Sequence, residues 1–195
     1  MNKQQPLDRI EKLKTGIGGL DAIADGGLPK GRTTLVSAMA GSSKTVFSVQ
    51  FLAEGIEQFA EPGVFVTPEE SPAGIRRNML GFDWEIDRWE ADGKWLFVDG
   101  SPQLGEETVI AGRYDLGALL ARVEYAVRKV NAKRVVIDSP AAIFSQFIDT
   151  SVVRSELFRF ATAPKSLGVT AVMTAERTAE YGDCAMASRN LLRTT

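Results

Sequence analysis

The chain has 195 residues, of which 44% are hydrophobic and 25% are charged, and its 23 lysines and arginines against 25 aspartates and glutamates leave a net charge of −2. This length suits one compact domain, and the near-neutral charge predicts binding neither to duplex nucleic acid nor to an anionic membrane surface. Because the chain has no histidine and a single cysteine, Cys184, it excludes His-ligated metal sites, Ser–His catalytic pairs and intramolecular disulfides. The polar N-terminus and the lack of an apolar run long enough to span a bilayer predict a cytoplasmic protein.

Short apolar segments alternate with helical patterns along the chain. Residues 13–32 are punctuated by glycine, which predicts turns. Apolar runs predict buried strands at residues 33–37, 64–67, 95–99, 134–138 and 170–174. Helical patterns lie at residues 44–59, at 116–130 and from Ser151 to Pro164, where proline should end or kink the helix. The alternation predicts an α/β fold with a mostly parallel central sheet flanked by helices.

The turn after the first predicted strand carries the strongest site signal. A P-loop, or Walker A motif, reads Gly-x-x-x-x-Gly-Lys-Ser/Thr between a strand and a helix, and Lys44 and Thr45 occupy its last two positions. There the lysine neutralises phosphates, the hydroxyl binds Mg²⁺, and the helix N-terminus supplies backbone amides. Both glycines of the pattern are replaced, by Ala38 and Ser43, so an ordinary turn with an exposed lysine stays an alternative on this motif alone. The candidate nucleotide-binding residues are Gly41, Ser42, Ser43, Lys44, Thr45 and Val46.

Two adjacent carboxylates, Glu69 and Glu70, follow the second predicted strand. Ligands of open α/β sheets bind at the carboxyl ends of the strands, where one of these acids would orient or deprotonate a water molecule facing a γ-phosphate. The alternative is that both are solvated acids favouring the N-terminus of a helix that Ser71 and Pro72 open. The pattern alone leaves both interpretations open.

Asp138 ends the fourth predicted strand, an apolar run. In P-loop enzymes an aspartate at this place holds Mg²⁺ directly or through water, whereas after any other buried strand it caps a helix. The three signals occur in the order Lys-Thr, Glu-Glu, Asp, each at a strand end. Their conjunction is much more specific than any one of them.

Longer motifs give a resemblance to a known family. They are the run Gly26-Gly-Leu-Pro-Lys-Gly-Arg-Thr-Thr-Leu-Val-Ser, then Phe51-Leu-Ala-Glu-Gly-Ile, Pro62-Gly-Val-Phe-Val-Thr-Pro-Glu-Glu-Ser-Pro, Ile137-Asp-Ser, Ser151-Val-Val-Arg-Ser-Glu-Leu-Phe-Arg and Thr174-Ala-Glu-Arg-Thr-Ala-Glu-Tyr-Gly. With these motifs the chain resembles the first of the two domains of the KaiC family of RecA-like ATPases, over residues 10–182.

The resemblance implies a RecA-like P-loop NTPase fold, a ring hexamer, and ATP bound with Mg²⁺ between subunits. It assigns Lys44 to the phosphates, Thr45 and Asp138 (the Walker B aspartate) to Mg²⁺, and Glu69 and Glu70 to the catalytic carboxylate pair. The implied activity is slow ATP hydrolysis in a regulatory, clock-type protein with regulatory protein partners. The kinase activity of the family belongs to the second domain and is not expected of this chain.

The end of the chain departs from the family pattern. After Gly182 the family continues with a segment like Gly-Val-Glu-Glu-Phe-Val and with further strands, whose Lys and Arg reach the neighbouring subunit's nucleotide. Codons for the tail that starts at Met186 can be chosen so that another reading frame gives such a segment. We therefore expect residues 1–183 to form an incomplete KaiC-like domain and residues 184–195 to be a frameshifted tail, with an ordinary divergent C-terminus as the alternative.

Two other functions remain open at this level. If the strands that complete the sheet and the basic residues that reach the neighbouring subunit are missing, the chain would be a non-catalytic remnant or scaffold of a KaiC-like protein. The sheet edge exposed in this way would be an aggregation risk. A RecA-type strand-exchange protein would share the fold. Against it stand the near-neutral charge and the lack of a basic, aromatic-bearing loop between Asp138 and Thr170.

Overall fold

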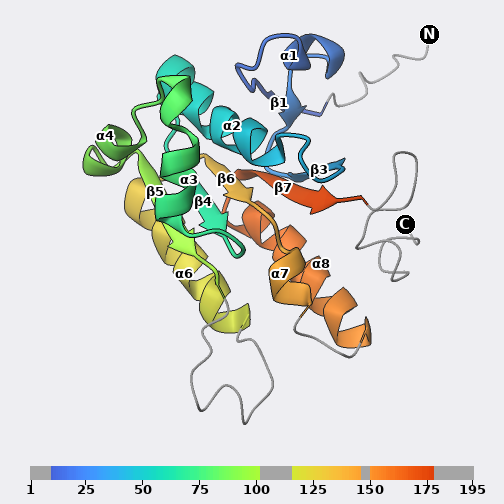
Figure 1. The fold of residues 1–195 in the computed structure, drawn as a ribbon. Helices are drawn as coiled ribbons and strands as arrows, with labels where there is room; N and C mark the ends of the chain where they lie inside the picture. The colour runs from blue at the N-terminus through green and yellow to red at the C-terminus, as the bar shows by residue number, and fades with distance from the viewer. Residues whose placement is uncertain (1–9, 102–115, 146–149, 178–195) are drawn as a thin grey trace, which may run out of the picture.

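The structure, a computed structural model, describes residues 10–101, 116–145 and 150–177 (Figure 1). The predictions made for the tail, including residues 184–195 and Cys184, lie outside the described residues. No helix within the described ranges is long and apolar enough to cross a membrane.

The predicted central sheet is confirmed. It has five strands in the order β3-β7-β6-β4-β5, and every neighbouring pair is parallel. All five strands fall where the apolar runs predict them, within two residues at each end. They are β3 (Thr33–Ala38), β4 (Gly63–Thr67), β5 (Trp95–Asp99), β6 (Arg134–Ile137) and β7 (Thr170–Glu176).

Three long helices connect or follow the strands, as the patterns predict. They are α2 (Lys44–Phe59), α6 (Leu116–Val130) and α8 (Thr150–Ser166). Pro164 lies within the last turn of α8, and the helix ends two residues later. A proline near a helix C-terminus removes a single backbone hydrogen bond, so the last turn still forms. Shorter elements are β1 (Lys12–Leu13), α1 (Leu20–Ile23), β2 (Leu28–Pro29), α3 (Pro72–Asn78), the 3₁₀ helix η1 (Leu80–Phe82), α4 (Ile86–Ala91) and α7 (Ala141–Phe144).

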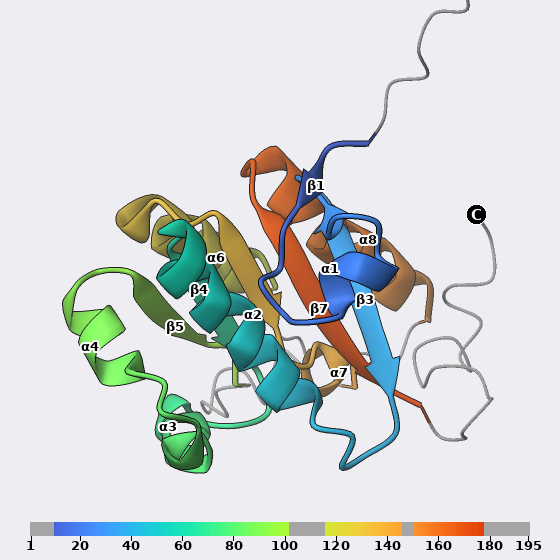
Figure 2. The same ribbon diagram turned by 90° about the horizontal axis from the view of Figure 1, so that it is seen from above.

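The helices cover both faces of the sheet, as Figures 1 and 2 show. Side chains alternate along each strand, so that Val64 and Val66 pack with α6 and α8, whereas Phe65 packs with α2, α3 and α4. In the same way Val135 faces one layer and Val136 the other. This is the α/β architecture of a RecA-like P-loop ATPase, with a hydrophobic core on each side of the sheet.

One charged side chain, Arg134, is buried completely at the start of β6. It forms an ion pair with Glu61 at 2.7 Å, and its guanidinium lies over the rings of Phe51 and Phe59. It also donates hydrogen bonds to the backbone carbonyls of Lys14, Thr15 and Phe51. Burial lowers the pKa of Arg134 from its ordinary value, although the Glu61 carboxylate opposes that shift. Arg134 thereby fastens the N-terminal segment to α2 and the sheet.

Candidate nucleotide site at the carboxyl edge of the sheet

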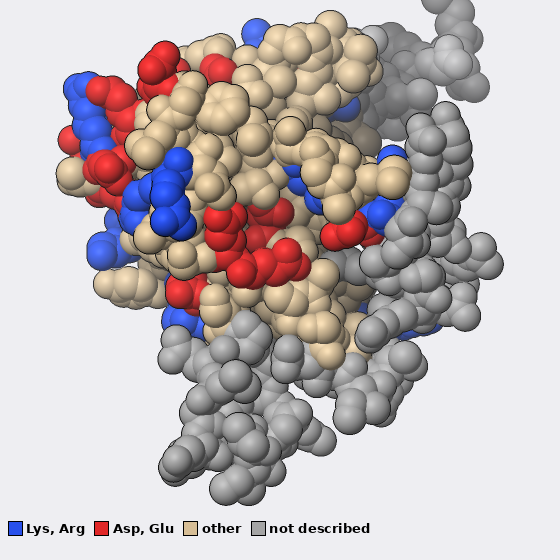
Figure 3. Space-filling view, in the orientation of Figure 1, with Lys and Arg blue, Asp and Glu red and all other residues tan. Residues whose placement is uncertain are grey.

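The residues singled out in the sequence follow strands that end at one edge of the sheet. Lys44 and Thr45 open α2 after β3, the two glutamates follow β4, and Asp138 follows β6 (Figure 1). Because these strands are parallel, their carboxyl ends lie along the same edge of the sheet, with β7 between β3 and β6. Figure 3 shows acidic side chains gathered on this face, over the ends of β4 and β6.

The turn that the sequence predicts to be a P-loop passes through left-handed backbone conformations. Gly41 has φ 74° and Ser43 has φ 57° with ψ 30°, directly before the first residue of α2. Glycine adopts such angles freely, whereas a residue with a β-carbon does so at a cost. Ser43 therefore bears strain where the usual motif has a glycine. No atom lies within 4 Å of the point where a β-carbon of Gly41 would be, so the backbone there faces open space.

The first turn of α2 offers an anion several unused donors. Among the described residues, the backbone N–H groups of Lys44, Thr45 and Val46 donate no hydrogen bond, and no side chain caps the helix. The Lys44 amine is held over the loop by the carbonyls of Met39, at 2.7 Å, and Ala38, at 3.3 Å. A positive helix end with free N–H groups and a lysine suits phosphate, so these residues fit a nucleotide.

The two adjacent glutamates point to different partners. Glu69 accepts a hydrogen bond from the Ser139 hydroxyl at 2.7 Å, which brings its carboxylate to the residue that follows Asp138. Glu70 accepts one from the Asn78 side chain at 2.6 Å, at the far end of α3. Helix α3 does begin after Ser71, whose hydroxyl accepts a hydrogen bond from the backbone N–H of Gly74. The structure thus joins Glu69 to Ser139, the residue after Asp138, and joins Glu70 to α3.

Asp138 is held from the neighbouring strand. The Thr174 hydroxyl, on β7, donates a hydrogen bond to its Oδ1 at 2.5 Å, and its backbone N–H donates to the carbonyl of Val66. The peptide bond between Asp138 and Ser139 is cis. Among the described residues, no group of three or more acidic or cysteine side chains is arranged to hold a metal ion. In nucleotide sites a hydroxyl and a carboxylate of the protein hold Mg²⁺ together with phosphate oxygens of the nucleotide, which suits Thr45 and Asp138.

Sequence reasoning missed two hydroxyls of this site, those of Ser139 and Thr174. Both appear only as members of longer motifs, and nothing in the local pattern marks either one as a site residue. The contact of Thr174 follows from the register of β6 against β7, in which Ile137 pairs with Met173. Asp138 follows Ile137 and Thr174 follows Met173, so this register places Asp138 beside Thr174.

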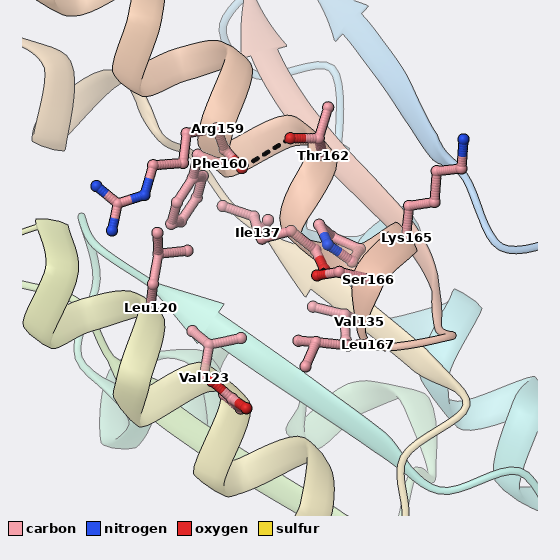
Figure 4. A pocket seen from close by; sticks show the side chains of 13 residues that line it. Leu120, Val123, Val135, Ile137, Arg159, Phe160, Thr162, Lys165, Ser166 and Leu167 are labelled. Carbon is pink, nitrogen blue, oxygen red and sulfur yellow. Dashed lines mark hydrogen bonds between the residues drawn. The ribbon is translucent and has the colours of Figure 1, made fainter.

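A groove of about 680 Å³ lies between α6 and α8, on the face of the sheet that these two helices cover (Figure 4). Its floor consists of Val135 and Ile137 from β6, and Phe160 and Leu167 form its α8 side. None of the residues predicted to bind nucleotide lines it. The predicted nucleotide site at the edge of the sheet is therefore separate from this groove.

Comparison with known proteins agrees with this geometry. The family described as "ATPase: KaiC" matches residues 13–188. The chain is 58% identical over 179 residues to the circadian clock protein KaiC3 of Synechocystis sp., covering 92% of this chain and 35% of that protein. It is 50% identical over 183 residues to the circadian clock oscillator protein KaiC of Thermostichus vulcanus, covering 93% of this chain and 35% of that protein. The chain thus spans about a third of the length of these relatives. With its P-loop sheet edge and a match over most of its length, it belongs to the KaiC family of ATPases.

Proposed function

We propose that the chain binds ATP with Mg²⁺ at the P-loop and hydrolyses it slowly. The observation that carries this proposal is the arrangement at one sheet edge. The free N–H groups and Lys44 at the start of α2 share that edge with Asp138 and with Glu69, whose carboxylate accepts a hydrogen bond from Ser139. Cation, hydroxyl and carboxylates are the groups that phosphoryl transfer to water requires.

Each residue has a distinct task in this proposal. Lys44 and the amides of Ser43 to Val46 hold the phosphates, and Thr45 and Asp138 hold the metal ion. The metal ion, when bound, neutralises charge on the phosphate oxygens. Glu69 orients the attacking water and takes its proton, using the oxygen that does not accept from Ser139. Glu70 supports this arrangement through its contact with Asn78 on α3.

The acidic edge also makes a divalent cation necessary. The exposed Glu69 and the half-buried Asp138 lie at the edge where the triphosphate would bind, and their negative charges repel those of the phosphates. Lys44 alone does not balance them. We expect ATP to bind tightly with Mg²⁺ and much more weakly after chelation, a dependence that a fluorescent ATP analogue measures directly.

The wider role is proposed from the family. The relatives named above are circadian clock proteins, and we propose a regulatory, clock-type role in the cytoplasm, as a homo-oligomer with protein partners. The ring hexamer implied by the resemblance is the assembly that we propose for the ATP-bound chain.

Substitution of three residues tests the proposed catalysis. Lys44→Ala should abolish ATP binding, because the phosphates lose their only lysine in the loop. Glu69→Gln should bind ATP as the parent chain does but release phosphate about 10²-fold more slowly, the usual cost of losing a general base. Glu70→Gln is the matched control, because glutamine still accepts from Asn78, and its turnover should stay near that of the parent chain.

The measurements are ATP-analogue binding and phosphate release from the purified chain. Equal slowing by Glu69→Gln and Glu70→Gln would contradict the separate tasks of the two acids. Unchanged turnover in the double glutamine variant would contradict the catalytic assignment as a whole.

A non-catalytic scaffold is the second candidate, and one observation favours it. Among the described strands, β3 pairs with β7 only, and its Leu35, which lines a hollow with residues of α8, is 43% exposed. An open edge with an apolar side chain is a surface for another chain. ATP binding without any phosphate release would select this candidate.

A further inference from the structure

We propose that Thr174 is a positioning residue for the metal site, which it serves by orienting the Asp138 carboxylate. This inference rests on the proposed binding of ATP with Mg²⁺ and names a residue of that site beyond those assigned to it above. It is carried by the geometry at the ends of β6 and β7, where a hydroxyl and a carboxylate face each other on adjacent strands.

The contact is short and sheltered. The Thr174 hydroxyl donates to Oδ1 of Asp138 at 2.5 Å, and Thr174 itself has no exposed surface. Hydrogen bonds that a hydroxyl gives to a carboxylate are shorter and stronger than those between neutral groups. Because threonine is stiff at its first side-chain torsion, the buried hydroxyl has little freedom to turn elsewhere.

The contact also makes the two carboxylate oxygens unequal. Oδ1 is occupied by Thr174, whereas Oδ2 accepts no hydrogen bond from the described residues. A carboxylate fixed at one oxygen presents the other in a defined direction, which is how groups behind a metal ligand raise the affinity for the ion. Thr174 therefore leaves Oδ2 as the oxygen that is free to face the metal ion or its water.

The same strand supplies a matched control. Thr170 lies four residues earlier on β7, is 1% exposed, and its hydroxyl oxygen accepts a hydrogen bond from the backbone N–H of Gly31. It is a buried, hydrogen-bonded threonine at the start of β7, where it pairs with Arg134 and lies away from Asp138. Thr170→Val and Thr174→Val remove the same atoms from similar surroundings, and Thr174 alone touches the acid.

The test measures how much free Mg²⁺ is needed for half-maximal binding of a fluorescent ATP analogue to the full chain. Thr174→Val should raise that concentration about tenfold or more, the usual effect of losing a group behind a metal ligand. Thr174→Ser keeps the hydroxyl and should restore most of the loss. Thr170→Val should leave the Mg²⁺ requirement as in the parent chain, even where it lowers the thermal midpoint.

The outcomes separate this inference from the proposed function. Failure of the parent chain to bind the analogue with Mg²⁺ overturns the proposed function and this inference with it. Normal binding by the parent chain with an unchanged Mg²⁺ requirement in folded Thr174→Val overturns this inference alone, as does an equal rise in Thr170→Val. If Thr174→Val does not fold, Thr174→Cys, whose thiol is a weak donor, takes its place with the same two readings.

Discussion

Ser43 shows how one residue sets the shape of a binding loop. The residue before Lys44 stands in a left-handed conformation, and the chain reaches it with a β-carbon present. Such a conformation costs an L-residue about 1–2 kcal/mol. The P-loop turn therefore forms without its usual glycine, at a cost that the rest of the fold offsets.

Substitutions at Ser43 should order themselves by backbone freedom. Ser43→Gly removes the strain, but the greater chain entropy that glycine loses on folding costs about 0.5–1 kcal/mol. We therefore expect the free energy of unfolding to be equal or slightly higher, and the ATP affinity to be at least as high. Ser43→Val should lower the free energy of unfolding by more than about 1 kcal/mol, because β-branched residues are true outliers in this region. Ser43→Ala, with a β-carbon but no branch, is the control. Urea unfolding that finds Val and Ala equally stable would contradict this account.

At the scale of elements, α2 and β6 approach each other closely through a glycine. Gly55 lies inside α2, and a β-carbon there would stand 2.5 Å from Cδ and Nε of Arg134. That arginine has no room to move aside, because its guanidinium is held by Glu61 and by three backbone carbonyls. Gly55 lowers the helix propensity of α2, but only glycine leaves enough room for Arg134 of β6. The packing between the two elements thus decides which residue stands here.

Gly55→Ala should therefore destabilise the protein, against the rule for helix interiors. Alanine favours a helix by about 1 kcal/mol over glycine, but overpacking a tight core costs about 1–3 kcal/mol. We expect a net loss of unfolding free energy of about 1 kcal/mol, measured by urea unfolding. Gly81→Ala is the control, since no atom lies within 4 Å of the point that its β-carbon would occupy, and it should cause no such loss. A more stable Gly55→Ala variant would show that Arg134 yields.

At the scale of the whole molecule, the open edge of β3 and the proposed ATP site make assembly the property to test. We expect the purified chain to elute as a hexamer in size-exclusion chromatography with ATP and Mg²⁺, and as a smaller species without them, because ligands that bind between subunits shift assembly by mass action. Lys44→Ala should remain in the smaller species under both conditions. A parent chain that stays monomeric with bound ATP would contradict the ring and favour the scaffold.

The architecture followed from the sequence because its signals are local and repeated. Apolar runs such as residues 134–137 and the long pattern of α6 identify elements by themselves, and their alternation leaves few arrangements. The same reasoning left out α4 and α7, whose six and four residues are too few for a helical period to show. The opening of α3 was found, since Ser71 and Pro72 are a cap and a first-turn residue.

The sequence predicts which residues make up the candidate site, but it does not predict their contacts. Lys44, Thr45, Glu69, Glu70 and Asp138 are predicted because they stand at strand ends in a known order, and their roles stay a prediction. That Glu69 meets Ser139 while Glu70 meets Asn78 depends on side-chain directions, which spacing does not give. Thr174 reaches Asp138 through strand register, a relation between segments far apart in the chain.

Strand β6 has a polar contact at each end, and each contact fixes the register of the strand in the sheet. Arg134 begins the strand in its buried site among backbone carbonyls, and Asp138 follows it under the hydroxyl of β7. A slip of one residue, about 3.3 Å, would turn every side chain of the strand to the wrong face and break both attachments together. Four residues alone would specify their alignment weakly. The polar contacts at its two ends fix the register of β6, and this register sets the position of Asp138 relative to the first turn of α2.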